Sequence, residues 1–146
     1  MQVSFVAGFG PIVQDIAASR AFWGAGLGIA LQEADPDYWT SDDLQGVRAF
    51  ALWPLSQAAE SCFGTGRWPE DIPVPQAWLE VDVESVAAVA AAAAELQAVG
   101  HRLLRGMRVE PWGQTTTRLL SPEGLLVGVT YTPAMHQTQA GASPAE

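Results

Sequence analysis

Lysine is absent from this chain of 146 residues, and all seven of its basic residues are arginine. Without lysine the protein has neither a Schiff-base nucleophile nor the lysine of a Walker-type phosphate loop. Basic residues are also few beside 16 Asp and Glu residues, so the formal net charge is −9. This charge disfavours nucleic acid and anionic membrane surfaces, and we expect neither as a partner.

Cysteine and histidine are almost as rare. The single cysteine, Cys62, cannot form an intrachain disulfide and has no activating neighbour in the sequence. The two histidines are His101, which follows a helix-ending glycine, and His136, which lies near the C-terminus. Neither has a second ligand at metal-binding spacing, so the sequence indicates no Cys/His zinc site and no Ser/His/Asp triad.

Long apolar runs are missing as well. No segment approaches the roughly 20 residues that span a bilayer, and the N-terminus lacks a basic region followed by an apolar core. The alanine run at 87–94 is expected to be a soluble helix because Glu84 and Glu95 flank it. We therefore expect a cytoplasmic protein. A hydrophobic content of 49% supports one domain with a substantial core.

One pattern occurs twice along the chain. Residues 9–13 are typical of a short strand. Asp15 is typical of a helix N-cap, and the helix that follows it has one apolar face and ends at Gly28. Residues 78–83 alternate as a strand, Ser85 is a second N-cap, and 86–99 favour a helix. The two caps are separated by 85 − 15 = 70 residues. Three shorter strands are expected after each helix, at 29–33, 38–41 and 47–53, and at 102–109, 114–120 and 125–132.

This duplication predicts an α+β fold class with two βαβββ modules. A single domain is expected over 1–133, with module one at about 3–54 and module two at about 77–133. Residues 55–76 are rich in proline and glycine and are expected to connect the modules. Residues 134–146 are small and polar, and we expect a disordered tail there.

The C-terminal part of the chain carries a resemblance to a known family. Pro111-Trp112-Gly113-Gln114 precedes a Thr-rich strand, and the turn Ser121-Pro122-Glu123-Gly124 leads into a β-branched run at 125–131, which predicts a hairpin. This order closes the repeated module and resembles the closing signature of the vicinal oxygen chelate superfamily. That superfamily includes glyoxalase I, extradiol dioxygenases and drug-binding proteins of the bleomycin-resistance type. The resemblance implies curved mixed sheets that form a cleft, completed by a second copy of the chain in a homodimer.

The resemblance also implies where a metal would bind. Metal-using members carry His or Gln seven residues before each helix cap, and these positions are Gly8 and Trp78 here. They carry Glu four residues after the turn glycine, which is Gly128 here, with Leu52 as its counterpart in module one. None of these four residues has a side chain that coordinates a cation, so we expect no metal and no cofactor.

Two alternatives stay open at this stage. A register shift of two residues would place Gln76, rather than Trp78, at the second metal position. A metal could also be held by other residues, such as Glu80 and Glu33. Module pairing within one chain and exchange of modules between two chains are both compatible with the length of the connector.

The same substitutions suggest a binding cleft. Gly8 and Gly128 are expected to open space at its floor, and Trp78 to supply a flat apolar wall. If Leu52 marks the concave side, Phe50 stacks there and Arg48 bonds an acidic or carbonyl-rich ligand. The candidate ligand-binding residues are Gly8, Arg48, Phe50, Leu52, Trp78, Glu80, Trp112, Arg118 and Gly128, and no catalytic or metal-binding residue is assigned.

Three classes of function are compatible with the sequence. The leading hypothesis is a metal-independent protein that sequesters an aromatic or otherwise apolar small molecule, with an antibiotic as one candidate, and acts as a homodimer. The second is a lyase, isomerase or dioxygenase that uses unassigned metal ligands, or Glu80 as a general base. The third is a subunit or sensor whose modules serve interaction only. The sequence leans against an enzyme and does not identify the ligand.

Overall fold

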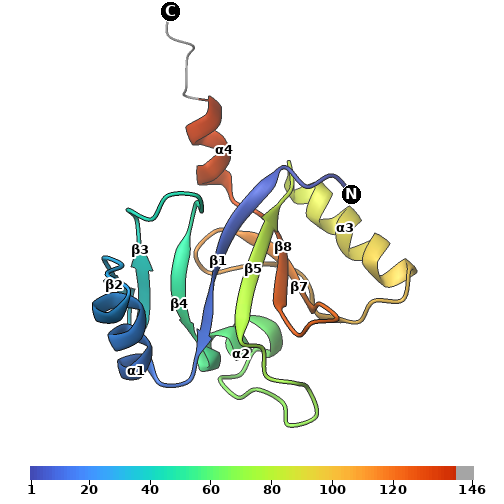
Figure 1. Cartoon of the computed structure of the whole chain (residues 1–146). Coiled ribbons are helices and arrows are strands. Elements are labelled where there is room, and N and C mark those ends of the chain that lie inside the picture. Colours follow the sequence, from blue (N-terminus) through green and yellow to red (C-terminus); the bar gives the residue numbers. More distant parts are fainter. Residues whose placement is uncertain (141–146) are drawn as a thin grey trace, which may run out of the picture.

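The computed structural model describes residues 1–140, with side chains up to residue 136. These residues form one eight-stranded sheet in the order β2-β3-β4-β1-β5-β8-β7-β6 (Figure 1). The strands are β1 (Phe5–Val13), β2 (Gln32–Asp35), β3 (Tyr38–Ser41), β4 (Phe50–Pro54), β5 (Ala77–Asp82), β6 (Leu103–Val109), β7 (Thr115–Leu120) and β8 (Leu126–Tyr131). The helices are α1 (Ile16–Arg20) with its π-helical continuation η1 (Ala21–Gly26), α2 (Leu55–Phe63), α3 (Val86–Ala98) and α4 (Pro133–Ala140).

The predicted α+β architecture of two βαβββ modules is confirmed. Strands β1 to β4 form one half of the sheet and β5 to β8 the other, and each half has the same strand order relative to its first strand. The halves join through an antiparallel pairing of β1 with β5, in which Gly8 lies opposite Glu80 and Gly10 opposite Trp78. The two modules therefore pair within one chain.

Both predicted helix caps are present. An oxygen of Asp15 accepts a hydrogen bond from the backbone N–H of Ala18 at 3.1 Å, and Ser85 accepts one from Ala88 at the same distance. Each bond satisfies one of the backbone N–H groups that a helix leaves without a partner in its first turn. The predicted hairpin is also present, because β7 pairs with β8 across a turn in which Gly124 has a φ of +87°.

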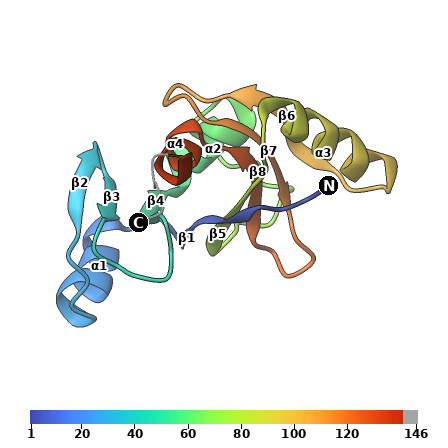
Figure 2. The ribbon, with the colours of Figure 1, turned by 90° about the horizontal axis from the view of Figure 1, so that it is seen from above.

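The sheet is curved, and its two faces carry different helices. Seen from above in Figure 2, α2 and α4 lie inside the curve, whereas α1 and α3 lie outside it. On the outer face, α3 packs against Val83 and Val129, while α1 and η1 cover Phe50 and Leu52. On the inner face, Ala58 and other residues of α2 pack against the concave side of the sheet.

The segments between and after the modules each contain a helix that the sequence did not predict. The connector at 55–76 contains helix α2, which fills part of the concave side of the sheet. Residues 133–140 form helix α4, where the sequence predicted disorder from 134 onwards, and the rest of the predicted tail, 141–146, lies outside the described residues. One anchor of α4 is an interaction between His136 and the buried carboxylate of Asp82. The sequence alone indicated no role for His136.

Within residues 1–140, no helix has both the length and the apolar character needed to cross a membrane.

Candidate functional site

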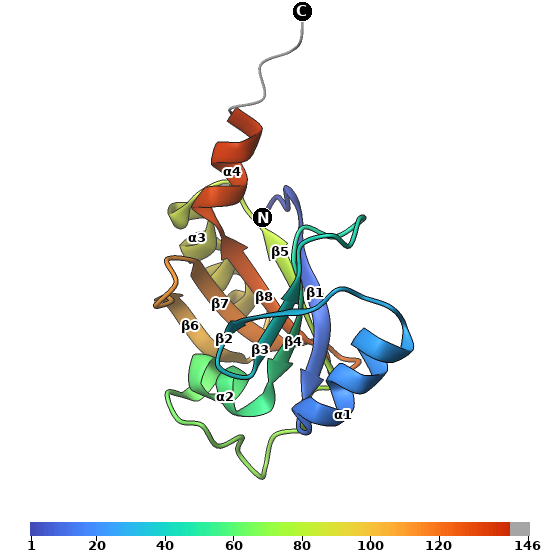
Figure 3. The same ribbon diagram turned by 90° about the vertical axis from the view of Figure 1, so that its left-hand side faces the viewer.

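A pocket of about 430 Å³ lies on the concave side of the sheet. Figure 3 shows α2 crossing one end of the strands and α4 at the other end, and the pocket has wall residues from both helices. Its apolar walls include three tryptophans. The lining residues are Ala34, Asp35, Tyr38, Ala49, Trp53, Gln57, Trp78, Glu80, Trp112, Gln114, Thr132 and Met135. Three of the nine predicted ligand-binding residues, Trp78, Glu80 and Trp112, are therefore brought together here.

The predicted facing of strand β4 is wrong by one residue. Phe50 and Leu52 are buried on the convex side, where they pack with Trp23 beneath η1. Ala49 and Trp53 line the pocket instead. Because side chains alternate along a strand, an error of one position moves every side chain to the other face. Trp53 was for this reason missed as a candidate site residue.

The same register corrects the predicted counterpart of Gly128 in module one. In module two, Glu80 of β5 pairs with Gly128 of β8. The modules are offset by 70 residues, so the residue of module one that corresponds to Glu80 is Gly10, and the counterpart of Gly128 is the residue of β4 beside Gly10. A Cβ at Gly10 would lie 2.0 Å from the carbonyl oxygen of Ala51, so Ala51 is the neighbour of Gly10 on β4. Ala51, rather than Leu52, is thus the counterpart of Gly128. Its methyl group is no better a metal ligand.

The site does not fit a metal ion held at the positions that the resemblance implies. Gly8 and Gly128 do not open space as predicted. A Cβ at Gly8 would lie 2.6 Å from the ring of Trp78, and one at Gly128 would lie 2.9 Å from a guanidinium nitrogen of Arg118. The indole and the guanidinium fill this space, so a metal ion would have to displace one of them. The described part of the chain contains no cluster of three or more His, Cys, Asp or Glu residues suited to a metal.

Arg118 lies beneath the pocket rather than in its lining. Its side chain is 0% exposed, and its Nη2 donates to Glu80 at 3.1 Å while its Nε donates to the hydroxyl of Ser61 at 2.8 Å. The Nε also lies 3.8 Å from the buried carboxylate of Glu110. The guanidinium therefore bridges two carboxylates and ties β7 to β5 and α2.

Glu80 is held on both of its oxygens. One accepts from Arg118, and the other accepts from the amide nitrogen of Gln114 at 2.9 Å. The same amide nitrogen donates to Thr132, and the amide oxygen of Gln114 accepts from the indole N–H of Trp112 at 3.0 Å. This chain of bonds fixes the orientation of the Gln114 amide and places Trp112, which is 60% exposed, at the rim of the pocket.

Tyr38 and Trp53 each bring a hydrogen-bond donor to the pocket. Among the described residues, neither the Tyr38 hydroxyl nor the Trp53 indole N–H has a hydrogen-bond partner. Burial raises the pKa of Tyr38 to about 12, with a smaller rise from Glu80 and an opposing effect of Arg118. The hydroxyl consequently stays protonated at neutral pH and can donate a hydrogen bond.

The remaining predicted residues lie elsewhere. Arg48 is exposed, stacks 3.7 Å above the ring of Phe5 and donates to the backbone oxygen of Met135. The sequence left open whether Gln76 or Trp78 stands at the second metal position. Gln76 is exposed and precedes β5, whereas Trp78 lies within β5, so Trp78 holds this position. Glu33 is exposed on β2 and does not line the pocket that contains Glu80.

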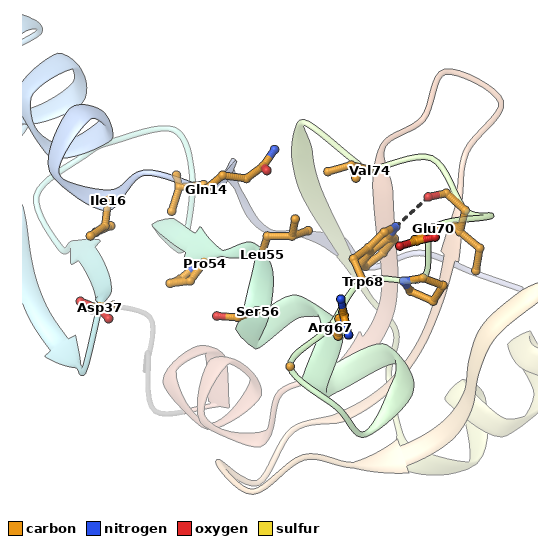
Figure 4. A pocket seen from close by; sticks show the side chains of 14 residues that line it. Gln14, Ile16, Asp37, Pro54, Leu55, Ser56, Arg67, Trp68, Glu70 and Val74 are labelled. Atoms are coloured by element: carbon orange, nitrogen blue, oxygen red, sulfur yellow. Dashed lines mark hydrogen bonds between the residues drawn. The ribbon is translucent and has the colours of Figure 1, made fainter.

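A second pocket, of about 560 Å³, lies where β4 meets the N-terminal end of α2 (Figure 4). It is more open than the first, and its labelled side chains come from the segment that leads from β1 into α1, the turn between β2 and β3, the junction of β4 with α2, and the loop after α2. Trp68 contributes one aromatic wall, and its indole N–H already donates to the carbonyl oxygen of Ile72 at 3.0 Å. This pocket therefore offers one tryptophan where the concave pocket offers three.

Comparisons with known proteins agree with the fold. No protein-family model matches the sequence, and a search of curated proteins finds no match. Solved structures do match, among them a glyoxalase/bleomycin resistance protein/dioxygenase superfamily member from Vibrio splendidus 12B01. It has a TM-score of 0.57 at 18% identity, with 87% of this chain and 97% of that chain covered.

Two larger proteins have a comparable likeness. The Mn(II)-bound glyoxalase from Novosphingobium aromaticivorans has a TM-score of 0.54 at 20% identity, with 89% of this chain and 39% of that chain covered. Homoprotocatechuate 2,3-dioxygenase from Arthrobacter globiformis has a TM-score of 0.57 at 23% identity, with 89% and 36% covered. The chain therefore has the fold of the glyoxalase/bleomycin resistance/dioxygenase superfamily. Because this fold carries different activities in these proteins, function has to be argued from the site.

Proposed function

We propose that the chain is a metal-independent binding protein for an aromatic or otherwise apolar small molecule. The observation that carries this proposal is the concave pocket, in which Trp53, Trp78 and Trp112 form walls around about 430 Å³. Pockets of this size with aromatic walls and a few polar groups are typical of small-molecule sites. Sequestration of an antibiotic would be one use of such a pocket.

The chemistry of the pocket supports binding without a metal. The four positions at which the resemblance places metal ligands hold Gly8, Ala51, Trp78 and Gly128. An indole fills the space beside Gly8, and a guanidinium fills the space beside Gly128. Apolar ligands bind such walls through burial of surface and ring stacking, neither of which needs a metal.

An enzyme that uses Glu80 as a general base is the second candidate, because this carboxylate lines the pocket. Both of its oxygens already accept hydrogen bonds, from Arg118 and from Gln114. A proton taken from a ligand would have to displace one of these bonds or share an oxygen with it. This arrangement favours a structural and orienting role for Glu80.

The proposal is tested with fluorene, a planar aromatic hydrocarbon, titrated into chelator-treated protein while tryptophan fluorescence is recorded. We expect saturable quenching with one site per chain, unchanged when nickel, zinc, manganese or iron(II) is added back. Trp112→Ala should weaken fluorene binding at least about fivefold, because it removes one stacking wall. The matched control is Phe22→Ala, since Phe22 is 57% exposed and lies on η1 away from the pocket.

Two results would count against this function. Absence of quenching in folded protein would show that the pocket does not accept a planar apolar molecule. Binding that requires added metal would restore the metal-dependent alternative. The homodimer stays a prediction, supported by exposed apolar side chains such as Val6 and Phe9 outside the pocket, and sedimentation of the purified chain would test it.

A further inference from the structure

We infer that the pocket selects planar aromatic molecules that carry an uncharged acceptor oxygen, such as a ketone or amide carbonyl, and that Tyr38 and Trp53 donate hydrogen bonds to it. This inference rests on the proposed function and narrows its ligand class. It makes Tyr38 and Trp53 residues that determine specificity, in addition to the stacking surfaces already described.

The indole N–H of Trp53 is the first ground for this inference. Three other tryptophans use theirs within the protein: Trp68 donates to Ile72, Trp78 to Ala51 and Trp112 to Gln114. Trp53 is only 6% exposed, yet among the described residues its N–H has no partner. Buried indole N–H groups usually find an acceptor. A ligand oxygen in the pocket that Trp53 lines would provide one.

The hydroxyl of Tyr38 is the second ground. Tyr38 lines the same pocket and, within the described part of the chain, also lacks a hydrogen-bond partner. Among the described residues, two polar side-chain atoms are both fully enclosed and without a hydrogen-bond partner, and these are Glu110 Oε2 and Arg118 Nη1. The Tyr38 and Trp53 donors are not among them, so these donors border accessible space. With a pKa of about 12, the Tyr38 hydroxyl donates rather than accepts as an anion.

The charges around the pocket indicate that the acceptor is neutral. Two carboxylates, Asp35 and Glu80, belong to the lining, and the described lining residues include no lysine or arginine. Arg118 is engaged beneath the pocket by Glu80 and Ser61. The whole chain carries a formal net charge of −9. An anionic ligand would therefore meet repulsion both locally and at long range.

The test compares two probes of nearly the same shape, fluorene and 9-fluorenone, which differ by one carbonyl group. We expect 9-fluorenone to bind the wild-type chain about 3- to 10-fold more tightly than fluorene, the effect of a neutral hydrogen bond. Tyr38→Phe should reduce this advantage, because one of the two donors is lost; the readout is the ratio of the two probe affinities measured on the same variant, so that a general change in binding cancels. Tyr131→Phe is the matched control, because Tyr131 is the other tyrosine of the chain and does not line the pocket.

The outcomes separate this inference from the proposed function. If fluorene binds and 9-fluorenone binds no better, or if Tyr38→Phe leaves the difference intact, the inference fails while the binding function stands. If neither probe binds folded protein, the proposed function fails. Fluorene-9-carboxylate should bind more weakly than fluorene, and tighter binding of this anion would overturn the requirement for a neutral acceptor.

Discussion

Replacing Arg118 by methionine will lower the free energy of unfolding by about 3 to 5 kcal/mol, the usual cost of removing one partner from a buried ion pair. Methionine keeps an unbranched apolar stem, so the effect reports the lost guanidinium more than lost volume. The guanidinium bridges Glu80 and Glu110, whose side chains are 13% and 1% exposed. Without it, among the described residues, Glu80 loses its ion-pair partner, and Glu110 keeps only the ion pair with Arg108 at 3.7 Å.

Urea unfolding followed by tryptophan fluorescence measures this loss. The matched control is Arg102→Met, because Arg102 is exposed and has no ion pair among the described residues. This control should lie within about 0.5 kcal/mol of the wild type. Adding Glu80→Gln and Glu110→Gln to Arg118→Met should recover part of the loss, since neither carboxylate charge then has to be kept away from water without the Arg118 guanidinium. Equal stability of Arg118→Met and the control would show that the ion pairs do not hold the floor of the pocket.

Replacing Gly10 by alanine will lower the free energy of unfolding by at least about 3 kcal/mol, at the upper end of overpacking effects. A Cβ at this position would lie 2.0 Å from the carbonyl oxygen of Ala51 and 2.9 Å from the indole nitrogen of Trp78. These two atoms form a hydrogen bond of 3.2 Å with each other. The new methyl group would therefore push β1 away from β4 and displace Trp78 from the pocket wall.

The control for this substitution is Gly106→Ala. Gly106 also lies in a strand, β6, but a Cβ there would meet no atom within 4 Å, and its φ is not positive. We expect its stability to stay within about 1 kcal/mol of the wild type. Fluorene binding should fall in Gly10→Ala and remain unchanged in Gly106→Ala. A stable Gly10→Ala chain with normal binding would contradict the close packing of β1, β4 and Trp78.

The sequence predicted the duplicated module because its signals are local. N-caps at Asp15 and Ser85, the turn that ends at Gly124 and alternation along the strands depend on residues close together in the chain. Helix α2 was missed because proline and glycine around it indicated a connector. Its helical structure also depends on packing against the concave face, which no local pattern reveals.

The site was predicted only in part, for a different reason. Trp78 was found because the resemblance identifies its position, Trp112 because it belongs to the closing signature, and Glu80 as a carboxylate outside the implied metal positions. The β4 candidates Phe50 and Leu52 were wrong because strand facing depends on a register of one residue, and three-dimensional pairing sets that register. The contact of Arg118 with Glu110 and Ser61 joins residues far apart in the chain, and alternation in β7 does not predict it.

The most direct test of the account is the set of indole N–H signals in a ¹⁵N–¹H spectrum of the chelator-treated chain during titration with 9-fluorenone. The chain has six tryptophans, so each reports on one place in the fold. We predict that the signals of Trp53, Trp78 and Trp112 shift, with the largest change at Trp53, and that those of Trp23, Trp39 and Trp68 stay in place. Shifts confined to Trp68 would place the ligand in the second pocket, and shifts in none of the three pocket tryptophans would contradict binding at the concave site.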